Sequence, residues 1–197
     1  MPAITSLLLL CLLQPTAVPP PLRIDLVFVG SIQPNIVATA MDEVISIWSP
    51  YHVDLHLSPA DAVPEGSVRL AVVLAKHHDD HLPAATLGSI RFRNGMPEPT
   101  ILMYSDTIDL LVAAAPEMRG DRECLPAVHN LAVGRAFGRA LAHEIGHYLL
   151  RSRQHGITGL MRATHRTPDL IAPERQGFEL SPWEAAQISE MTSLAHE

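Results

Sequence analysis

The chain has 197 residues, of which 47% are hydrophobic and 18% are charged. That length and composition indicate one globular domain with a buried core and exclude a disordered chain. With 14 Lys and Arg against 21 Asp and Glu, the net charge of −7 argues against nucleic acid as a partner. The 11 histidines are the unusual count, because histidine is often a metal ligand and a proton-transfer group near neutral pH.

The N-terminus carries a short apolar run, SLLLLCLL, over residues 6–13. It is too short to span a bilayer, which takes about 20 apolar residues, so we expect no stable membrane span. It favours a signal peptide over 1–17, followed by a proline-rich linker over 18–22 and the mature domain over 23–197. The protein is then secreted or periplasmic. No charged side chain precedes Arg23, and if the run is not a signal, the protein is cytoplasmic with an apolar N-terminal arm.

The first half of the mature chain alternates between strand and helix patterns. A β-branched and apolar run over 23–29 predicts a buried strand. Residues 34–48 carry apolar side chains at the spacing of one helical face, which predicts a helix. Strict alternation over 52–57 predicts a half-buried strand. The run over 67–74 is more continuously apolar and predicts a central strand.

In the second half, two strands are predicted over 88–93 and 99–104. A connecting segment over 106–125 with room for a helical turn follows, and then come two helices, over 126–150 and from Ser181 onward. Arginines on the first of these strands are typical of a sheet edge. Gly134 and Gly138, one turn apart on the long helix, permit close approach of a neighbour. This order of elements predicts a mixed α/β single domain.

The long helix contains the sequence HEIGH over residues 143–147, which matches H-E-x-x-H. Residues four apart on a helix lie one above the other, so the imidazoles of His143 and His147 can reach a single ion. Glu144 is rotated by about 100° from His143 around the helix. It therefore lies beside the ion, where it can hold and deprotonate a bound water.

A catalytic zinc takes three protein ligands and keeps one open position. The candidates for the third ligand are His155, His165, Glu174 and Glu179. His155 is the nearest to the end of the helix and best suits the ligand preference of zinc. A glutamate in this position would make the site resemble that of the gluzincins, which are thermolysin-like peptidases.

A third histidine followed by Met161 resembles the metzincin clan of zinc metallopeptidases. In that clan the chain turns after the active-site helix, supplies a third histidine, and passes a methionine beneath the metal in a tight Met-turn. The resemblance implies one catalytic Zn²⁺ held by His143, His147 and His155, with Glu144 as the general base and Met161 as the Met-turn residue. It also implies the zincin fold, an α+β (mixed α/β) domain with a twisted, mainly parallel sheet, one antiparallel edge strand, an active-site helix and a C-terminal helix.

The spacing departs from the usual metzincin pattern, H-E-x-x-H-x-x-G-x-x-H. That pattern places Gly at position 150 and His at 153, where this chain has Leu150 and Arg153. The third histidine is therefore two residues late. The turn after the helix must be made by Leu150, Arg151 or Ser152.

These patterns favour a zinc-dependent metalloendopeptidase whose peptide or protein substrate lies extended along the strand over 88–93. A zinc-stabilised binding domain without catalysis is the alternative, together with a gluzincin-type peptidase that uses a different third ligand. We interpret the polar cluster His77–His81 as a solvated loop rather than a second cation site. Cys124 is interpreted as a free thiol, since Cys11 leaves with the signal peptide.

Overall fold

The computed structural model describes residues 20–59, 61, 64, 67–76, 81–118 and 125–194. Several predicted features lie outside the described residues, namely the signal peptide over 1–17, the first two linker residues, His77–Asp80 and Cys124. Within the described part, the helices are all too short or too polar to cross a membrane.

The described residues form five strands, β1 (Leu22–Val29), β2 (Val53–Leu57), β3 (Val68–Ala75), β4 (Gly88–Arg93) and β5 (Met96–Tyr104). They also form five α-helices, α1 (Pro34–Trp48), α2 (Ser105–Ala114), α3 (Pro126–Leu149), α4 (Thr167–Ile171) and α5 (Pro182–Leu194), and two 3₁₀ turns, Ser49–Tyr51 and Pro116–Met118. The predicted mixed α/β class is confirmed.

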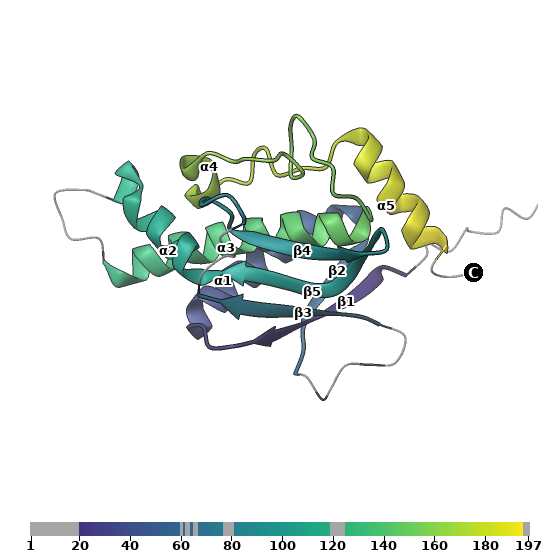
Figure 1. Ribbon diagram of the computed structural model, residues 1–197, viewed down its shortest axis with the longest axis horizontal. Coiled ribbons are helices and arrows are strands. Elements are labelled where there is room, and N and C mark those ends of the chain that lie inside the picture. The colour runs from purple at the N-terminus through teal and green to yellow at the C-terminus, as the bar shows by residue number, and fades with distance from the viewer. Residues whose placement is uncertain are drawn as a thin grey trace, which may run out of the picture.

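The strands form one sheet in the order β2-β1-β3-β5-β4 (Figure 1). All neighbouring pairs are parallel except β4 and β5, which are antiparallel. Two predictions are thereby confirmed: β3 is the central strand, and β4, which carries Arg91 and Arg93, lies at the edge. A register shift between Ile90 and Phe92 bends β4 within this antiparallel pair.

The segment from 96 to 114 is more regular than its sequence predicted. β5 begins three residues earlier than expected, at Met96, although Pro97 and Pro99 follow. Pairing with β3 starts only at Thr100, so the missing N–H groups of the two prolines do not interrupt that ladder. Residues 105–114, expected to contain no more than a helical turn, form helix α2 because Ile108 and Val112, four residues apart, both bury completely.

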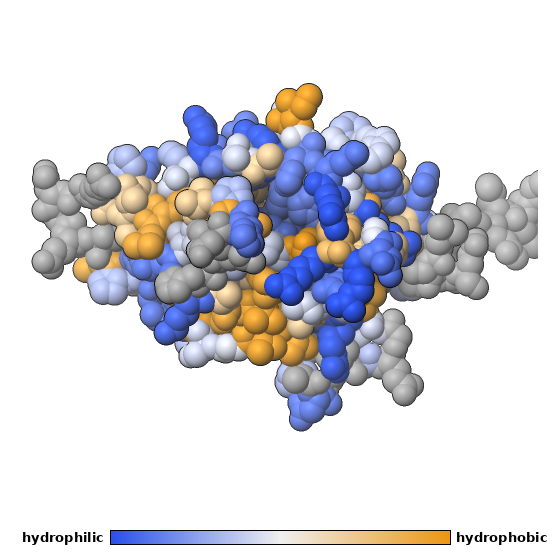
Figure 2. All heavy atoms as spheres, in the orientation of Figure 1, coloured by the Kyte–Doolittle hydropathy of each residue, from blue (hydrophilic) through white to orange (hydrophobic). Residues whose placement is uncertain are grey.

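Helices α1 and α3 cover one face of the sheet and pack closely on each other. A Cβ atom on Gly138 would lie 2.6 Å from the carbonyl oxygen of Ala40, and one on Gly134 would lie 2.6 Å from Cβ of Thr39. The two glycines therefore permit the close approach that their spacing predicted. The opposite face of the sheet has an apolar area over β3 and β5 at the surface (Figure 2).

A buried ion pair lies between these two helices. Nε of Arg139 on α3 donates to the carboxylate of Glu43 on α1 at 3.0 Å, and neither side chain is more than 3% exposed. The two other nitrogens of the guanidinium donate to the carbonyls of Asp169 and Glu174. Arg139 thus fastens the segment between α3 and α5 to the core, one helical turn before His143.

Candidate metal centre

Helix α3 places His143 and His147 on one face, as their spacing predicted. Their ring centroids are 4.7 Å apart and their Nε2 atoms 3.0 Å apart. The helix ends at Leu149, and Arg151 then takes a left-handed conformation with φ of 47°. Of the three residues expected to make the turn, Arg151 is the one that reverses the chain, in a conformation that favours glycine.

The reversed chain brings His155 back to the helix. Nε2 of His155 lies 3.3 Å from Nε2 of His147, and the rings of His155 and His143 stack with centroids 5.3 Å apart. The candidate ligand atoms of the three histidines all lie within 4.8 Å of one another. These three residues can hold a metal ion, and the later position of the third histidine does not prevent their convergence.

Backbone carbonyls fix the orientation of both helical imidazoles. Nδ1–H of His143 donates to the carbonyl of Leu160 at 2.8 Å, and Nδ1–H of His147 donates to the carbonyl of Ser152 at 2.7 Å. In a neutral imidazole the proton on Nδ1 leaves a lone pair on Nε2. Two lone pairs that face each other at 3.0 Å cannot form a hydrogen bond, so the arrangement suits a cation between them.

Protonation of the rings does not supply that cation at neutral pH. Burial, together with the neighbouring His147, lowers the pKa of His143 to about 3. Burial also lowers the pKa of His147, against the effect of its hydrogen bond to Ser152. Both helical imidazoles are therefore neutral near pH 7, which is the form that binds metals.

Glu144 lies beside the histidines on the same helix and points toward the edge strand β4. Its carboxyl group accepts a hydrogen bond from the backbone of Ile90, and a Cβ atom on Gly88 would lie 3.0 Å from its Cγ. Only 7% of the residue is exposed. Burial raises the pKa of Glu144 to about 8, against the opposing effect of the Ile90 hydrogen bond. A small residue at position 88 leaves room for this side chain between α3 and β4.

Met161 lies in a tight loop against the same helix. The amide of Gly156 donates to the carbonyl of Met161 at 2.8 Å and closes the loop. A Cβ atom on Gly146 would overlap Sδ of Met161, whose side chain is almost fully buried. The glycine between the two helical histidines thus allows the thioether to pack directly on the backbone of α3. The preceding carbonyl, that of Leu160, is the one that accepts from His143.

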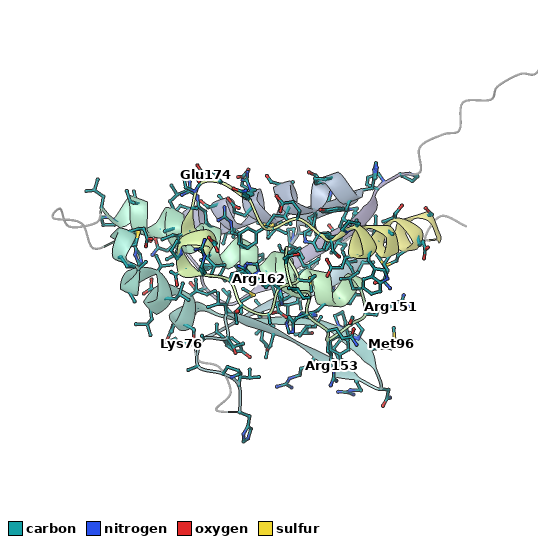
Figure 3. The ribbon with its side chains drawn as sticks, turned by 90° about the horizontal axis from the view of Figure 1, so that it is seen from above. Lys76, Met96, Arg151, Arg153, Arg162 and Glu174 are labelled. Atoms are coloured by element: carbon teal, nitrogen blue, oxygen red, sulfur yellow. The ribbon has the colours of Figure 1, made fainter. Side chains whose placement is uncertain are left out.

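The rival third ligands do not join the cluster. Nε2–H of His165 donates to the carbonyl of Leu160 at 3.2 Å, and its Nδ1 accepts from Arg162 at 3.3 Å, so both ring nitrogens have partners. The carboxylate of Glu179 accepts from the amide of Gly177 at 2.9 Å. Glu174 lies on the opposite side of the molecule from Arg153 in the view of Figure 3. Among the described residues, only His143, His147 and His155 form a group that can hold a metal.

The three histidines and Glu144 line an open cleft of about 600 Å³ between β4 and the segment that follows Met161. The cleft is also lined by His165, which the sequence offered only as a rival ligand, and by Arg153, which stands where the usual pattern has its third histidine. Three further lining side chains were not singled out from the sequence, namely Arg139, Arg162 and Phe92. Arg153 lies over the ring of Phe92, with its Cζ 4.8 Å from the centroid, and donates to the carbonyl of Phe92 at 3.2 Å. In the sequence, the one indication that Arg162 lines the site is its position directly after Met161.

In comparisons with known proteins, no family model matches this chain, and no curated protein matches its sequence at a significant level.

Proposed function

We propose that this protein is a zinc-dependent metalloendopeptidase with a metzincin-like domain, in which His143, His147 and His155 hold the zinc ion. The observation that carries the proposal is the convergence of three imidazoles on one point, with the two helical Nε2 lone pairs facing each other, beside a buried glutamate in an open cleft. Three ligands and an open position are what a catalytic zinc takes.

The donor set favours zinc or another late transition metal over magnesium and calcium. All three candidate ligand atoms are imidazole nitrogens, which suit zinc and other late transition metals, whereas magnesium and calcium prefer oxygen. The backbone acceptors at Leu160 and Ser152 hold the Nδ1 protons of two of these rings. Such outer hydrogen bonds fix the tautomer and raise the basicity of the ligand nitrogen.

The chemistry of the site follows from Glu144. When bound, the metal supplies Lewis acidity, which polarises a scissile carbonyl and lowers the pKa of a water ligand. A cation at the three histidines also favours the ionised form of the neighbouring Glu144, whose pKa is about 8 without it. The Glu144 carboxylate then accepts a proton from the attacking water and passes it to the leaving amine.

The substrate lies extended along β4, whose outer edge faces the cleft. Gly88 and Ser89 line the cleft and are available as a template for main-chain pairing, whereas the backbone N–H of Ile90 already donates to Glu144. The carbonyl of Phe92 already accepts a hydrogen bond from Arg153, so pairing with the substrate is confined to the first half of the strand. Export of the protein through the apolar run at its N-terminus remains part of this proposal.

Replacing Glu144 by glutamine tests the mechanism, because the two side chains have the same shape and only the glutamate can accept the proton. The E144Q variant should bind one zinc ion per chain, as the wild type does, and lose peptide hydrolysis. Glu190→Gln is the matched control, since Glu190 is an exposed residue of α5 and the same chemical change there should leave hydrolysis intact.

Two results would contradict the proposal. Hydrolysis that survives in zinc-loaded E144Q would remove Glu144 from the mechanism. A wild-type protein that binds zinc, loses thermal stability with a chelator and cuts no peptide would instead be the zinc-stabilised binding domain.

A further inference from the structure

The cleft contains more positive than negative side chains. Three arginines line it, which are Arg139, Arg153 and Arg162, and Glu144 is its only acidic residue among the described ones. Arg139 has a carboxylate of its own, because Glu43 pairs with it in the core. A substrate that enters this cleft therefore meets a local excess of positive charge.

Arg162 has no acidic partner to itself. Its nearest carboxylate oxygen is Oδ2 of Asp169 at 3.5 Å. That carboxylate already accepts two shorter hydrogen bonds from Arg166, at 2.9 and 2.7 Å. Nε of Arg162 has no hydrogen-bond partner among the described residues although it is shielded from solvent. An unpaired buried donor is unfavourable until a ligand satisfies it.

The guanidinium of Arg162 is also held in place. Its Nη2 donates to Nδ1 of His165 at 3.3 Å. The ring of His165 is in turn stacked on Phe178 with centroids 4.6 Å apart and lies 6.3 Å from the ring of His143. A fixed guanidinium loses less rotational freedom when it binds a ligand, and its planar fork matches a carboxylate. About a third of the side chain, 36%, is open to solvent, so a ligand can reach it.

We infer that Arg162 recognises a carboxylate of the substrate, so that this peptidase selects peptides with a negative charge next to the bond that is cut. The inference rests on the proposed function, since it names the substrate class of the same site. Two sources of that carboxylate share this chemistry, an Asp or Glu side chain and the free C-terminus of a peptide. Figure 3 shows Arg162 on the segment over the middle of the domain, with Arg153 nearer to β4.

The test uses peptides of one sequence that carry either Glu or Gln beside the cut bond and have amidated C-termini. Zinc-loaded wild type should show a kcat/KM for the Glu peptide at least about tenfold above that for the Gln peptide, which corresponds to about 1.4 kcal/mol. A second arm compares free and amidated C-termini on the Gln peptide. A preference for the charged peptide in either arm supports the inference, and no preference in both overturns it.

Variants assign the preference to Arg162. In R162Q the ratio should fall to about one, whereas D169N, which removes the competing carboxylate, should raise it above the wild-type value. Opposite signs in these two variants cannot come from a folding defect. R69Q is the control, because Arg69 lies on the face of β3 opposite to buried Leu70, and its ratio should stay at the wild-type value. A preference that persists in R162Q would overturn the inference.

Failure of the proposed function gives a different result. If the zinc-loaded wild type cuts none of the peptides, the peptidase proposal fails, and the same labelled peptides are then used in a binding assay by fluorescence anisotropy. Tighter binding of the charged peptide by wild type, lost in R162Q, would support carboxylate recognition at Arg162. Equal binding of the charged and neutral peptides would overturn it.

Discussion

Replacing Arg139 by methionine should cost the protein more stability than any comparable change on helix α3. The side chain is fully buried and makes three kinds of contact: with the carboxylate of Glu43, with two backbone carbonyls, and with the ring of Phe178, whose centroid is 4.9 Å from Cζ. Methionine fills much of the same space and removes every donor. Glu43 keeps one partner, because Arg175 also donates to it at 3.1 Å.

The magnitude follows from these contacts. The carbonyls of Asp169 and Glu174 lose a charged donor, at about 1–3 kcal/mol for each unpaired group. Breaking a buried ion pair from one side costs about 3–5 kcal/mol. The contributions overlap, and the remaining Arg175 contact reduces them, so we expect the free energy of unfolding to fall by about 3–5 kcal/mol.

Urea unfolding in the presence of a chelator measures this loss without a contribution from bound metal. Arg135→Met is the matched control on the same helix, because Arg135 donates, among the residues that the structure describes, only to the carbonyl of Ile171, at 3.2 Å. It should cost about 1 kcal/mol. Equal losses for R139M and R135M would refute the reasoning, since the buried pair would then contribute no more than one partly exposed hydrogen bond.

Three further predictions concern the metal site and the turn beside it. In metal-free protein, the raised pKa of Glu144 means that its stabilising effect is complete below pH 4.5 and is lost as pH rises toward 8. The contribution of Glu144 to the free energy of unfolding should therefore fall by about 2 kcal/mol between pH 6.5 and 8. Histidines with a lowered pKa, such as His143, act in the opposite direction as their unfolded forms lose protons, so the fall should appear in the difference in stability between wild type and E144Q, measured by chemical unfolding at several pH values. His155→Ala should lower zinc affinity more than about 100-fold in a competition assay, while His129→Ala, remote from the site and bonded to Asp109, should leave it unchanged; equal effects would remove His155 from the ligand set. Arg151→Gly should raise the free energy of unfolding by up to about 1 kcal/mol because it relieves a left-handed arginine, and a lower melting temperature for that variant would contradict this explanation.

The sheet and the metal cluster were predictable because their signals are local. Apolar continuity marked β3 as central, and arginines on a short strand marked β4 as an edge. Residues four apart lie close together on any helix, so the spacing of His143 and His147 was enough to predict that their rings meet. For His155, proximity along the chain was a sufficient guide, since a left-handed residue reverses the chain at once.

The walls of the cleft could not be predicted in the same way. In the sequence, nothing distinguishes Arg139 from any other arginine on a helix. Its burial could not be predicted because its partner Glu43 lies 96 positions away. The roles of Arg162 and His165 in the cleft depend on contacts that only the fold creates. His165 contacts the carbonyl of Leu160, and Arg162 lies next to the carboxylate of Asp169. Long-range pairings of this kind have no periodic signature. The same limit applies to the metzincin resemblance, because it depends on one short motif while the rest of the cleft is built from distant segments.

The coordination of zinc tests the account most directly. X-ray absorption at the zinc edge on protein loaded with one equivalent of metal should show three imidazole nitrogens at about 2.0–2.1 Å and one further light-atom ligand. In H155A the spectrum should lose one imidazole. A site with two imidazoles in the wild type, or with four protein ligands and no open position, would contradict a catalytic metal held by His143, His147 and His155.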